Sequence, residues 1–328
     1  MVLFWVKFLR LFNPSCLHLF SEDEIYKNIV VMKKYQFRKA DAFATKKSNG
    51  NPAGYILLNK LSDMTDGEML QIAKELKGFV SEVGYVAQAG ENEFDFKYYS
   101  SERELDFCGH VTIATMYDLI RTSEDKASDS YIINTNRGKL IVENRIQSED
   151  SVFVMAPEPV ENNNVPGISE IAGKLRISES EIAAGFPVSI INAGLETLIV
   201  PIAGLDSILG IQPDLDELKD FCYNSGVDII EVFTPDVYDT ANDYRTRVFA
   251  PTFGYIEDPA TGSGNSAFGY YLIKNGLWDK DTVTIEQNGN RGHYNVVKLQ
   301  QQPDKNNNQC VYFGGGSIKR IEGEYLTY

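Results

Sequence analysis

The strongest constraint on the fold is an internal repeat, which places two similar helix starts in the two halves of the chain. Laying Cys108 on Thr261 aligns Gly109 with Gly262, and further matches follow at Ala114 and Ala267, Tyr117 and Tyr270, and Leu119-Ile120 and Leu272-Ile273. Each copy has a polar tripeptide with a central glycine before an apolar stretch without proline. Such a start leaves backbone N–H groups free, and the helix dipole favours an anion beside them. The repeat predicts two similar lobes and one carboxylate-binding site between them.

Composition limits the class of protein and of partner. The 328 residues suffice for two domains of ordinary size, and the 43% hydrophobic and 23% charged shares are typical of soluble globular proteins. The net charge of −15 argues against a nucleic-acid partner, because phosphate binding needs a clustered basic surface. The four cysteines have neither metal-ligand spacing nor the density of a disulfide scaffold. Only three histidines are present, which argues against a site of several His ligands. We expect a cytoplasmic protein with reduced thiols.

The first 31 residues differ from the rest of the chain. Residues 1–20 are rich in Leu and Phe, but Lys7 and Arg10 interrupt them and Pro14 breaks them. A bilayer span needs roughly 20 apolar residues, and a secretory signal would place its charge first and end in small residues. We interpret residues 1–31 as an N-terminal extension outside the core, with Met32 as the functional start. The alternative is a peripheral amphipathic anchor. We expect no membrane partner.

Strand and helix signals repeat on both sides of a loop rich in Pro and Asn at 157–166. In the first half, we expect helices at 65–76 and 110–120, and strands at 36–44, 53–58, 81–87, 94–99, 131–135, 140–142 and 151–155. In the second half, we expect helices at 168–175, 178–184, 214–225 and 264–275, and strands at 194–201, 228–234, 244–250, 282–287, 294–301, 310–313 and 317–321, with a polar turn at 304–309.

One helix in each half is almost entirely apolar, which indicates a helix surrounded by strands. The predicted fold class is therefore α+β with two comparable lobes. The N-terminal lobe is predicted at 32–156, which the C-terminal strand at 317–328 would complete, and the C-terminal lobe at 157–316.

Eight short motifs occur in a fixed order along the chain. They are Asp41-Ala42-Phe43, Gly50-Asn51-Pro52-Ala53-Gly54, Ser81-Glu82, Phe107-Cys108-Gly109-His110, Gly194-Leu195, Arg247-Val248-Phe249-Ala250-Pro251, Glu257-Asp258-Pro259-Ala260-Thr261-Gly262-Ser263 and Ile285-Glu286-Gln287. Together they resemble the PhzF-like family, the phenazine-biosynthesis isomerase relatives of diaminopimelate epimerase. The resemblance runs from about Met32 to the C-terminus.

The resemblance implies a fold of two pseudo-symmetric lobes, each a barrel-like sheet around a central helix, with the site in the cleft. It also implies a homodimer that uses no cofactor and no metal. The phenazine-pathway enzyme shifts a proton on a cyclic dihydro-hydroxyanthranilate. By this resemblance Glu82 matches the general acid/base, and His110, Asp258 and Ser263 match residues that line the site. The remaining expected substrate-binding residues are Asn51, Cys108, Gly109, Thr261 and Gly262.

This chain departs from the family pattern beside two of these motifs. Val83-Gly84 follows Glu82 where many members have Thr-Ala, and Gly264-Asn265 follows Ser263 where many have Ala-His. These departures leave the substrate open.

Each candidate residue also has an ordinary structural interpretation. Glu82 lies in an apolar strand, where it could simply face solvent; an acid in an apolar pocket instead has a raised pKa that suits proton transfer at neutral pH. His110 could be a core or capping histidine. Asp258, Thr261 and Ser263 could cap a helix with their side chains.

The pairing of Cys108 with Thr261 limits the chemistry. A two-thiol racemase needs a thiolate on each face of one carbon, and threonine cannot supply the second. We therefore expect a cofactor-independent isomerase in a biosynthetic process, which acts on a small carboxylate with Glu82 as general acid/base. Two alternatives remain: a lyase or dehydratase acting on a hydroxy acid, and a non-catalytic protein that binds small molecules on the same scaffold.

Overall fold

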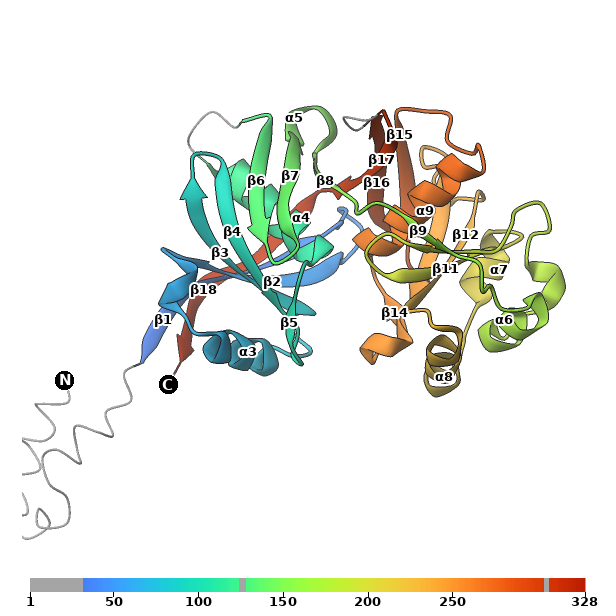
Figure 1. Cartoon of the computed structure of the whole chain (residues 1–328), viewed down its shortest axis with the longest axis horizontal. Coiled ribbons are helices and arrows are strands. Elements are labelled where there is room, and N and C mark those ends of the chain that lie inside the picture. Colours follow the sequence, from blue (N-terminus) through green and yellow to red (C-terminus); the bar gives the residue numbers. More distant parts are fainter. Residues whose placement is uncertain (1–31, 124–127, 304–306, 328) are drawn as a thin grey trace, which may run out of the picture. The chain divides into compact units, whose positions relative to one another are not determined.

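The computed structural model describes residues 32–123, 128–303 and 307–327 (Figure 1). These residues divide into a small unit, of which 32–35 and 324–327 are described, and a large compact unit, Gln36–Gly323. The described part of the small unit comprises the outer ends of the first and last strands, and Lys34 forms an ion pair there with Glu324. The predicted extension at 1–31 lies outside the described residues, as does the first half, 304–306, of the predicted turn at 304–309. All other elements belong to the large unit.

The first half of the sheet forms the wall around one helix. Its strands are β1 (Lys33–Ala42), β2 (Asn51–Leu58), β3 (Glu82–Gly90), β4 (Glu93–Tyr99), β5 (Glu104–Leu105), β6 (Ser130–Thr135), β7 (Gly138–Arg145) and β8 (Ser151–Met155). The pairs β2–β3 and β4–β6 are parallel, and the pairs β1–β2, β3–β4, β4–β5, β6–β7 and β7–β8 are antiparallel. The predicted hairpin of β6 and β7 is thereby confirmed.

The second half repeats this construction. Its strands are β9 (Val160–Asn162), β10 (Ser189–Asn192), β11 (Glu196–Pro201), β12 (Ile229–Thr234), β13 (Tyr244–Phe249), β14 (Glu257–Asp258), β15 (Thr282–Gln287), β16 (Asn295–Pro303) and β17 (Gln309–Gly315). Strand β17 pairs with β16 on one side and with β8 on the other, so it joins the two halves into one sheet. Strand β18 (Ser317–Thr327) returns to β1, where Arg38 pairs with Glu322 and Arg320 with Asp41.

Two helices occupy the interior, one in each half (Figure 1). Helix α4 (Gly109–Thr122) packs on β2, β3 and β8, and helix α9 (Gly262–Lys274) packs on β10, β11, β12, β16 and β17. Nine of the 14 residues of α4 and ten of the 13 residues of α9 are buried, which explains their nearly continuous apolar sequence. The α+β fold of two pseudo-symmetric lobes around central helices is confirmed. The exact lobe limits, 32–156 and 157–316, stay a prediction.

The other helices lie outside these central two. They are α3 (Asp66–Glu75), α5 (Ile146–Glu149), α6 (Ile168–Leu175), α7 (Leu205–Gly210) and α8 (Leu215–Ser225), with short 3-10 turns η2 (Leu61–Asp63), η3 (Glu179–Glu181) and η4 (Pro251–Phe253). Thr65 and Glu68 form a capping box at the start of α3, the helix predicted at 65–76. In the described part of the chain, no helix is both long and apolar enough to cross a bilayer.

The sequence-based prediction is wrong at two places in the second half. The helix expected at 178–184 is reduced to η3, because Ile182 forms a bridge with Ile202 and the Ala183 amide donates to the Pro201 carbonyl. The loop expected at 157–166 contains β9, which pairs with β10. In both cases tertiary pairing overrides the local signal.

One buried acid in this scaffold has no partner among the described residues. Glu231 lies in β12, a strand whose six residues are all buried, and neither of its carboxyl oxygens has a hydrogen bond. Oε2 lies 2.6 Å from the point that a Cβ on Gly264 would occupy, so glycine at 264 leaves the space that Glu231 fills. Burial raises the pKa of Glu231 well above 4.5. The folded protein therefore holds this carboxyl in its neutral form.

We expect Glu231→Gln to stabilise the protein progressively as the pH rises. The unfolded wild-type chain releases the Glu231 proton above about pH 4.5, whereas the folded chain retains it. The free energy of unfolding of the wild type therefore falls by about 1.4 kcal/mol for each pH unit, until the pH reaches the raised pKa of Glu231. Urea unfolding at pH 5.5, 6.5 and 7.5 measures the difference between variant and wild type. The exposed Glu170→Gln serves as control. A difference that does not change with pH would contradict the neutral assignment.

Candidate active site

The two aligned helix starts meet in the structure. Cys108 is the N-cap residue of α4 and Thr261 that of α9, so Gly109 and Gly262 are the first residues of the two helices. A Cβ on Gly109 would lie 3.8 Å from the Gly262 Cα and 3.0 Å from the ring of Phe313, and a Cβ on Gly262 would lie 2.6 Å from the same ring. Phe313 of β17 therefore packs against both helix starts, and glycine is required at both.

Neither helix start is closed by a side chain. The N-cap residues Cys108 and Thr261 make no side-chain capping bond, so the ordinary capping interpretation does not hold for Thr261. Within the described residues, the first amides of both helices, at Gly109, His110, Gly262 and Ser263, have no hydrogen-bond acceptor. Two helix N-termini with free N–H groups thus point to one region, where a negative charge is favoured.

A hydrogen-bond network between the halves fixes the second of these helix starts. Asn51 of β2 donates through Nδ2 to Asp258 Oδ1 at 2.9 Å and to the Ala260 carbonyl at 2.8 Å. The Thr261 hydroxyl donates to the other oxygen of Asp258. Gln287 accepts the Thr261 amide at 3.0 Å and donates to the Asp258 carbonyl at 3.0 Å. These bonds hold the carboxylate of Asp258 in a defined position in the cleft.

Glu82, His110 and Cys108 form a second polar group on the first lobe. Glu82 begins β3 beside Ala53, and its side chain is 14% exposed, so it does not simply face solvent. His110 Nε2 lies 3.2 Å from Glu82 Oε2, a charge contact whose angle is too poor for a hydrogen bond, and Nδ1 lies 3.5 Å from Cys108 Sγ. The imidazole therefore lies between a thiol and a carboxylate.

The surroundings of His110 favour its charged form. Burial opposes protonation, but the interactions with Cys108 and then with Glu82 outweigh burial and raise the pKa of His110 well above 6.5. The imidazolium can donate from Nδ1 to the sulfur, while its charge at Nε2 lies 3.2 Å from the carboxyl group of Glu82. A raised folded-state pKa means that these contacts contribute full stability below about pH 6.5 and lose it as the pH rises through the raised value.

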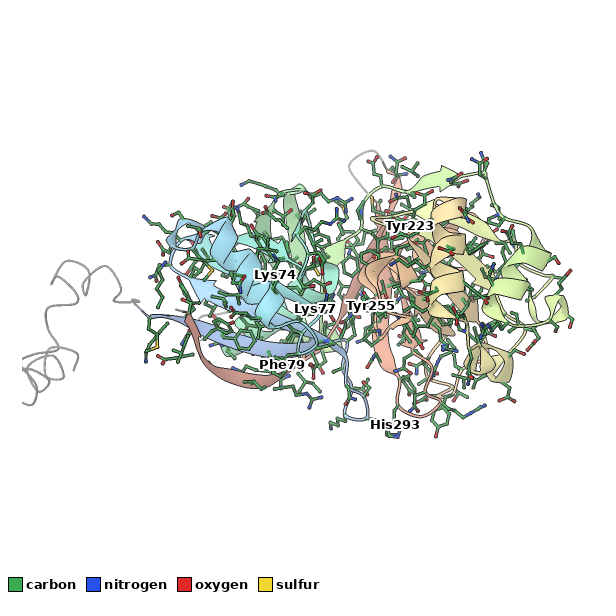
Figure 2. The ribbon with its side chains drawn as sticks, turned by 90° about the horizontal axis from the view of Figure 1, so that it is seen from below. Lys74, Lys77, Phe79, Tyr223, Tyr255 and His293 are labelled. Atoms are coloured by element: carbon green, nitrogen blue, oxygen red, sulfur yellow. The ribbon has the colours of Figure 1, made fainter. Side chains whose placement is uncertain are left out.

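Asp258 and Tyr255 also have perturbed pKa values. Burial raises the pKa of Asp258 to about 6, although the charge of His110 and the hydrogen bonds from Thr261 and Asn51 oppose that shift. Burial also raises the pKa of Tyr255, and the charges of Asp258 and Glu82 add to the effect. Tyr255 as a residue is 37% exposed, and it lies between the two halves of the structure (Figure 2). Its hydroxyl is therefore a neutral donor near both carboxyl groups.

A cavity of about 430 Å³ lies beside this arrangement. Seven of the nine predicted site residues line it, namely Cys108, Gly109, His110, Asp258, Thr261, Gly262 and Ser263. The other two, Glu82 and Asn51, contact lining residues directly. A shallow surface hollow of about 500 Å³ shares none of these residues and has no comparable chemistry.

Sequence reasoning missed Tyr255, Phe253, Arg103 and Arg137, which also line the cavity. Tyr255 lies only three residues before Asp258, so its proximity to the motif could have indicated it. Arg103 and Arg137 belong to none of the eight motifs, and only the tertiary fold brings them to the cleft.

The ligand atoms of Glu82, Cys108 and His110 lie within 4.8 Å of one another, a spacing that could hold a metal ion. However, the sulfur lies at one ring nitrogen of His110 and the carboxylate at the other. A metal ion would bind to only one of these two nitrogens, so the ligand atom at the other nitrogen would lie on the far side of the ring from it. The side chains as placed therefore do not fit a single ion shared by all three residues.

Comparisons with known proteins place the chain among similar sequences and folds. The family described as phenazine biosynthesis-like protein (PhzC-PhzF) matches residues 40–323. An uncharacterized isomerase of Clostridium acetobutylicum is 25% identical over 306 residues, 90% of this chain and 99% of that protein. The uncharacterized isomerase YfhB of Bacillus subtilis is 27% identical over 273 residues, 82% of this chain and 91% of that protein. The crystal structure of a PhzF-family phenazine biosynthesis protein of Bacillus anthracis has a TM-score of 0.79 at 23% identity, with 90% of this chain and 100% of that chain covered. This last likeness shows the fold.

We expect Cys108→Ala to lower the pKa of His110, because the sulfur makes the largest contribution that raises it. Glu82→Gln should lower it too, because the charge beside Nε2 is lost. A pH titration of the imidazole ring signals by NMR measures both changes. The chain has three histidines, and the signal absent from His110→Asn identifies the one of interest. A pKa unchanged in both variants would contradict the placement of the imidazole between these groups.

Proposed function

The chain belongs to the phenazine biosynthesis-like (PhzC-PhzF) family, and on that premise we propose that it is an isomerase that shifts a proton on a small carboxylate-bearing metabolite. The names of the relatives, uncharacterized isomerases, support the reaction class. The observation that carries the proposal is that charged His110, in contact with Glu82, lines one cavity together with the two open helix starts.

The substrate carboxylate binds to the free amides at the two helix starts. Those of Gly109 and His110 come from one lobe and those of Gly262 and Ser263 from the other. Backbone N–H groups and helix dipoles suit a carboxylate, and they also stabilise the negative charge that spreads onto it when a proton leaves the adjacent carbon. The same group therefore binds the substrate and stabilises the transition state.

Glu82 takes the proton from one carbon and returns it to another. The positive charge of His110 lies 3.2 Å from the carboxyl group of Glu82, which is thereby placed to act as the base. Once Glu82 has accepted the proton, the same carboxyl group is the acid for the second step. One residue on one side of the cleft is thus sufficient, and the chemistry requires no cofactor.

Asp258 contacts the substrate from the second lobe. Its pKa of about 6 leaves it mostly ionised at neutral pH, and Asn51 and Thr261 already donate to its two oxygens. Each oxygen can accept a further hydrogen bond. Asp258 therefore orients a hydroxyl or amino group of the substrate.

Each alternative function requires a different set of residues from the isomerase proposal. A lyase acting on a hydroxy acid would use Cys108 and Thr261 as its pair, but the Thr261 hydroxyl already donates to Asp258. A non-catalytic binding protein has no need of an acid at position 82. Both alternatives are therefore less consistent with the geometry. The homodimer implied by the resemblance stays a prediction.

We expect Glu82→Gln to lower turnover by about 10²- to 10⁴-fold, because the amide keeps the shape of the side chain but cannot transfer the proton. Cys108→Ala should retain most of the activity, since the sulfur acts only through His110. Proton exchange between solvent and a panel of small cyclic and unsaturated carboxylates, followed by NMR, measures both variants across the whole class of candidate substrates. If Cys108→Ala is as inactive as Glu82→Gln, the thiol is chemically required and the lyase alternative is favoured.

We expect the product formed in deuterated water to keep the mass of the substrate apart from deuterium at the new C–H position. Incorporation can be incomplete where the closed cavity slows exchange of the Glu82 proton with solvent. Mass spectrometry and NMR of the product measure this. A product lighter by one water would contradict the isomerase proposal, and a rate that chelation abolishes and added metal restores would contradict the cofactor-free mechanism.

A further inference from the structure

Two arginines line the active-site cavity without a partner. The chain has a net charge of −15, and the cavity wall also includes Asp106 and Asp228. Nevertheless, within the described residues the guanidinium groups of Arg103 and Arg137 form neither an ion pair nor a hydrogen bond. Asp228 instead accepts the backbone amide of Glu196 at 2.8 Å. A guanidinium left unpaired beside a cavity in an acidic protein is available for an anionic ligand.

Arg137 is held in place by an ordered turn. It lies with Asn136 in the two-residue turn between β6 and β7, and Gly138, at φ +107°, completes the turn. The Thr135 hydroxyl accepts the Arg137 amide at 3.1 Å and donates to the Gly138 carbonyl at 3.0 Å. The Asn136 side chain donates to Glu104 at 2.9 Å, which ties the turn to β5. The backbone that carries the guanidinium is therefore fixed.

The guanidinium of Arg137 reaches across to the second lobe. Gly194, in the turn between β10 and β11, has φ +123°, a conformation that favours glycine. A Cβ at that position would lie 3.6 Å from Arg137 Nη1 and 3.5 Å from the Cβ of Ser263. Arg137 and Ser263, in the first turn of α9, thus both lie next to Gly194. A ligand held by the α9 amides therefore needs only a short chain of atoms to reach the guanidinium of Arg137.

We propose that Arg137 binds a second anionic group of the substrate and so selects small dianions over monoanions. This inference rests on the proposed function, which places the first carboxylate at the helix starts. A planar guanidinium can form two parallel hydrogen bonds with a carboxylate or with a phosphate-type group. Arg137 is a specificity residue in this scheme, and the proton transfer by Glu82 does not depend on it.

The test compares three probes of similar length: butyrate with one anionic group, succinate with two carboxylates, and 3-phosphonopropionate with a carboxylate and a phosphonate. Calorimetric titration of the full chain at low ionic strength should give about tenfold tighter binding of the better dianion than of butyrate. Arg137→Gln should remove this preference and leave butyrate affinity unchanged, and Arg137→Lys should keep part of it. The relative affinities of succinate and 3-phosphonopropionate identify the preferred second group.

Arg145→Gln is the matched control, because it removes the same charge from the other end of β7, where Arg145 pairs with Glu143. That variant should keep the preference for dianions. Equal binding of butyrate and succinate by the wild type, or a preference that survives Arg137→Gln, would overturn the inference. So would a preference lost in Arg103→Gln and kept in Arg137→Gln.

The amide NMR signals of Gly109 and Gly262 separate this result from a failure of the proposed function. If butyrate shifts both signals while Arg137→Gln has no effect on dianion binding, only the inference about Arg137 is wrong. If no probe shifts them, the proposed carboxylate site is wrong, and the inference falls with it.

Discussion

The packing of two helix starts against one aromatic ring determines the rest of the site. Phe313 lies so close to Gly109 and Gly262 that a side chain on either residue would overlap it or press tightly on it. Because neither first helical residue has a side chain, the first amides of both helices stay uncovered and the two dipoles converge. The anion-binding property is therefore a consequence of core packing, as is the glycine in each copy of the repeat.

This convergence also makes it possible to bury acids close together. Glu82 and Asp258 approach from different lobes, and the charge of Glu82 adds to the burial that raises the pKa of Asp258. The charge of His110 and the two helix N-termini compensate, and the bonds from Asn51 and Thr261 satisfy Asp258. A substrate carboxylate adds a third negative charge. In the proposed scheme, the positive charge of Arg137 at the cavity wall compensates a fourth negative charge, that of the second anionic group of the substrate.

Local sequence signals were sufficient for the central features and insufficient where tertiary contacts decide. The repeat alignment placed Cys108 and Thr261 at equivalent positions, and both prove to be N-cap residues, because a helix start depends on a few neighbouring residues. The neutral state of Glu231 depends on space left by Gly264, which lies 33 positions along the chain and on another element. The reach of Arg137 to Gly194 likewise depends on how the two halves pack. No periodicity in the sequence indicates either contact.

The asymmetry of the repeat has a stereochemical consequence. The pseudo-symmetric scaffold has two equivalent N-cap positions with different contacts. The sulfur of Cys108 contacts His110 Nδ1, whereas the hydroxyl of Thr261 donates a hydrogen bond to Asp258. The proposed base and its charged partner therefore lie on the first lobe, and the second lobe holds an acid that is already hydrogen-bonded at both oxygens. If Glu82 alone moves the proton, removal and return occur on one face of the substrate. In that case the two N-cap positions, of which only Cys108 carries a thiol, do not act as a pair of opposed bases.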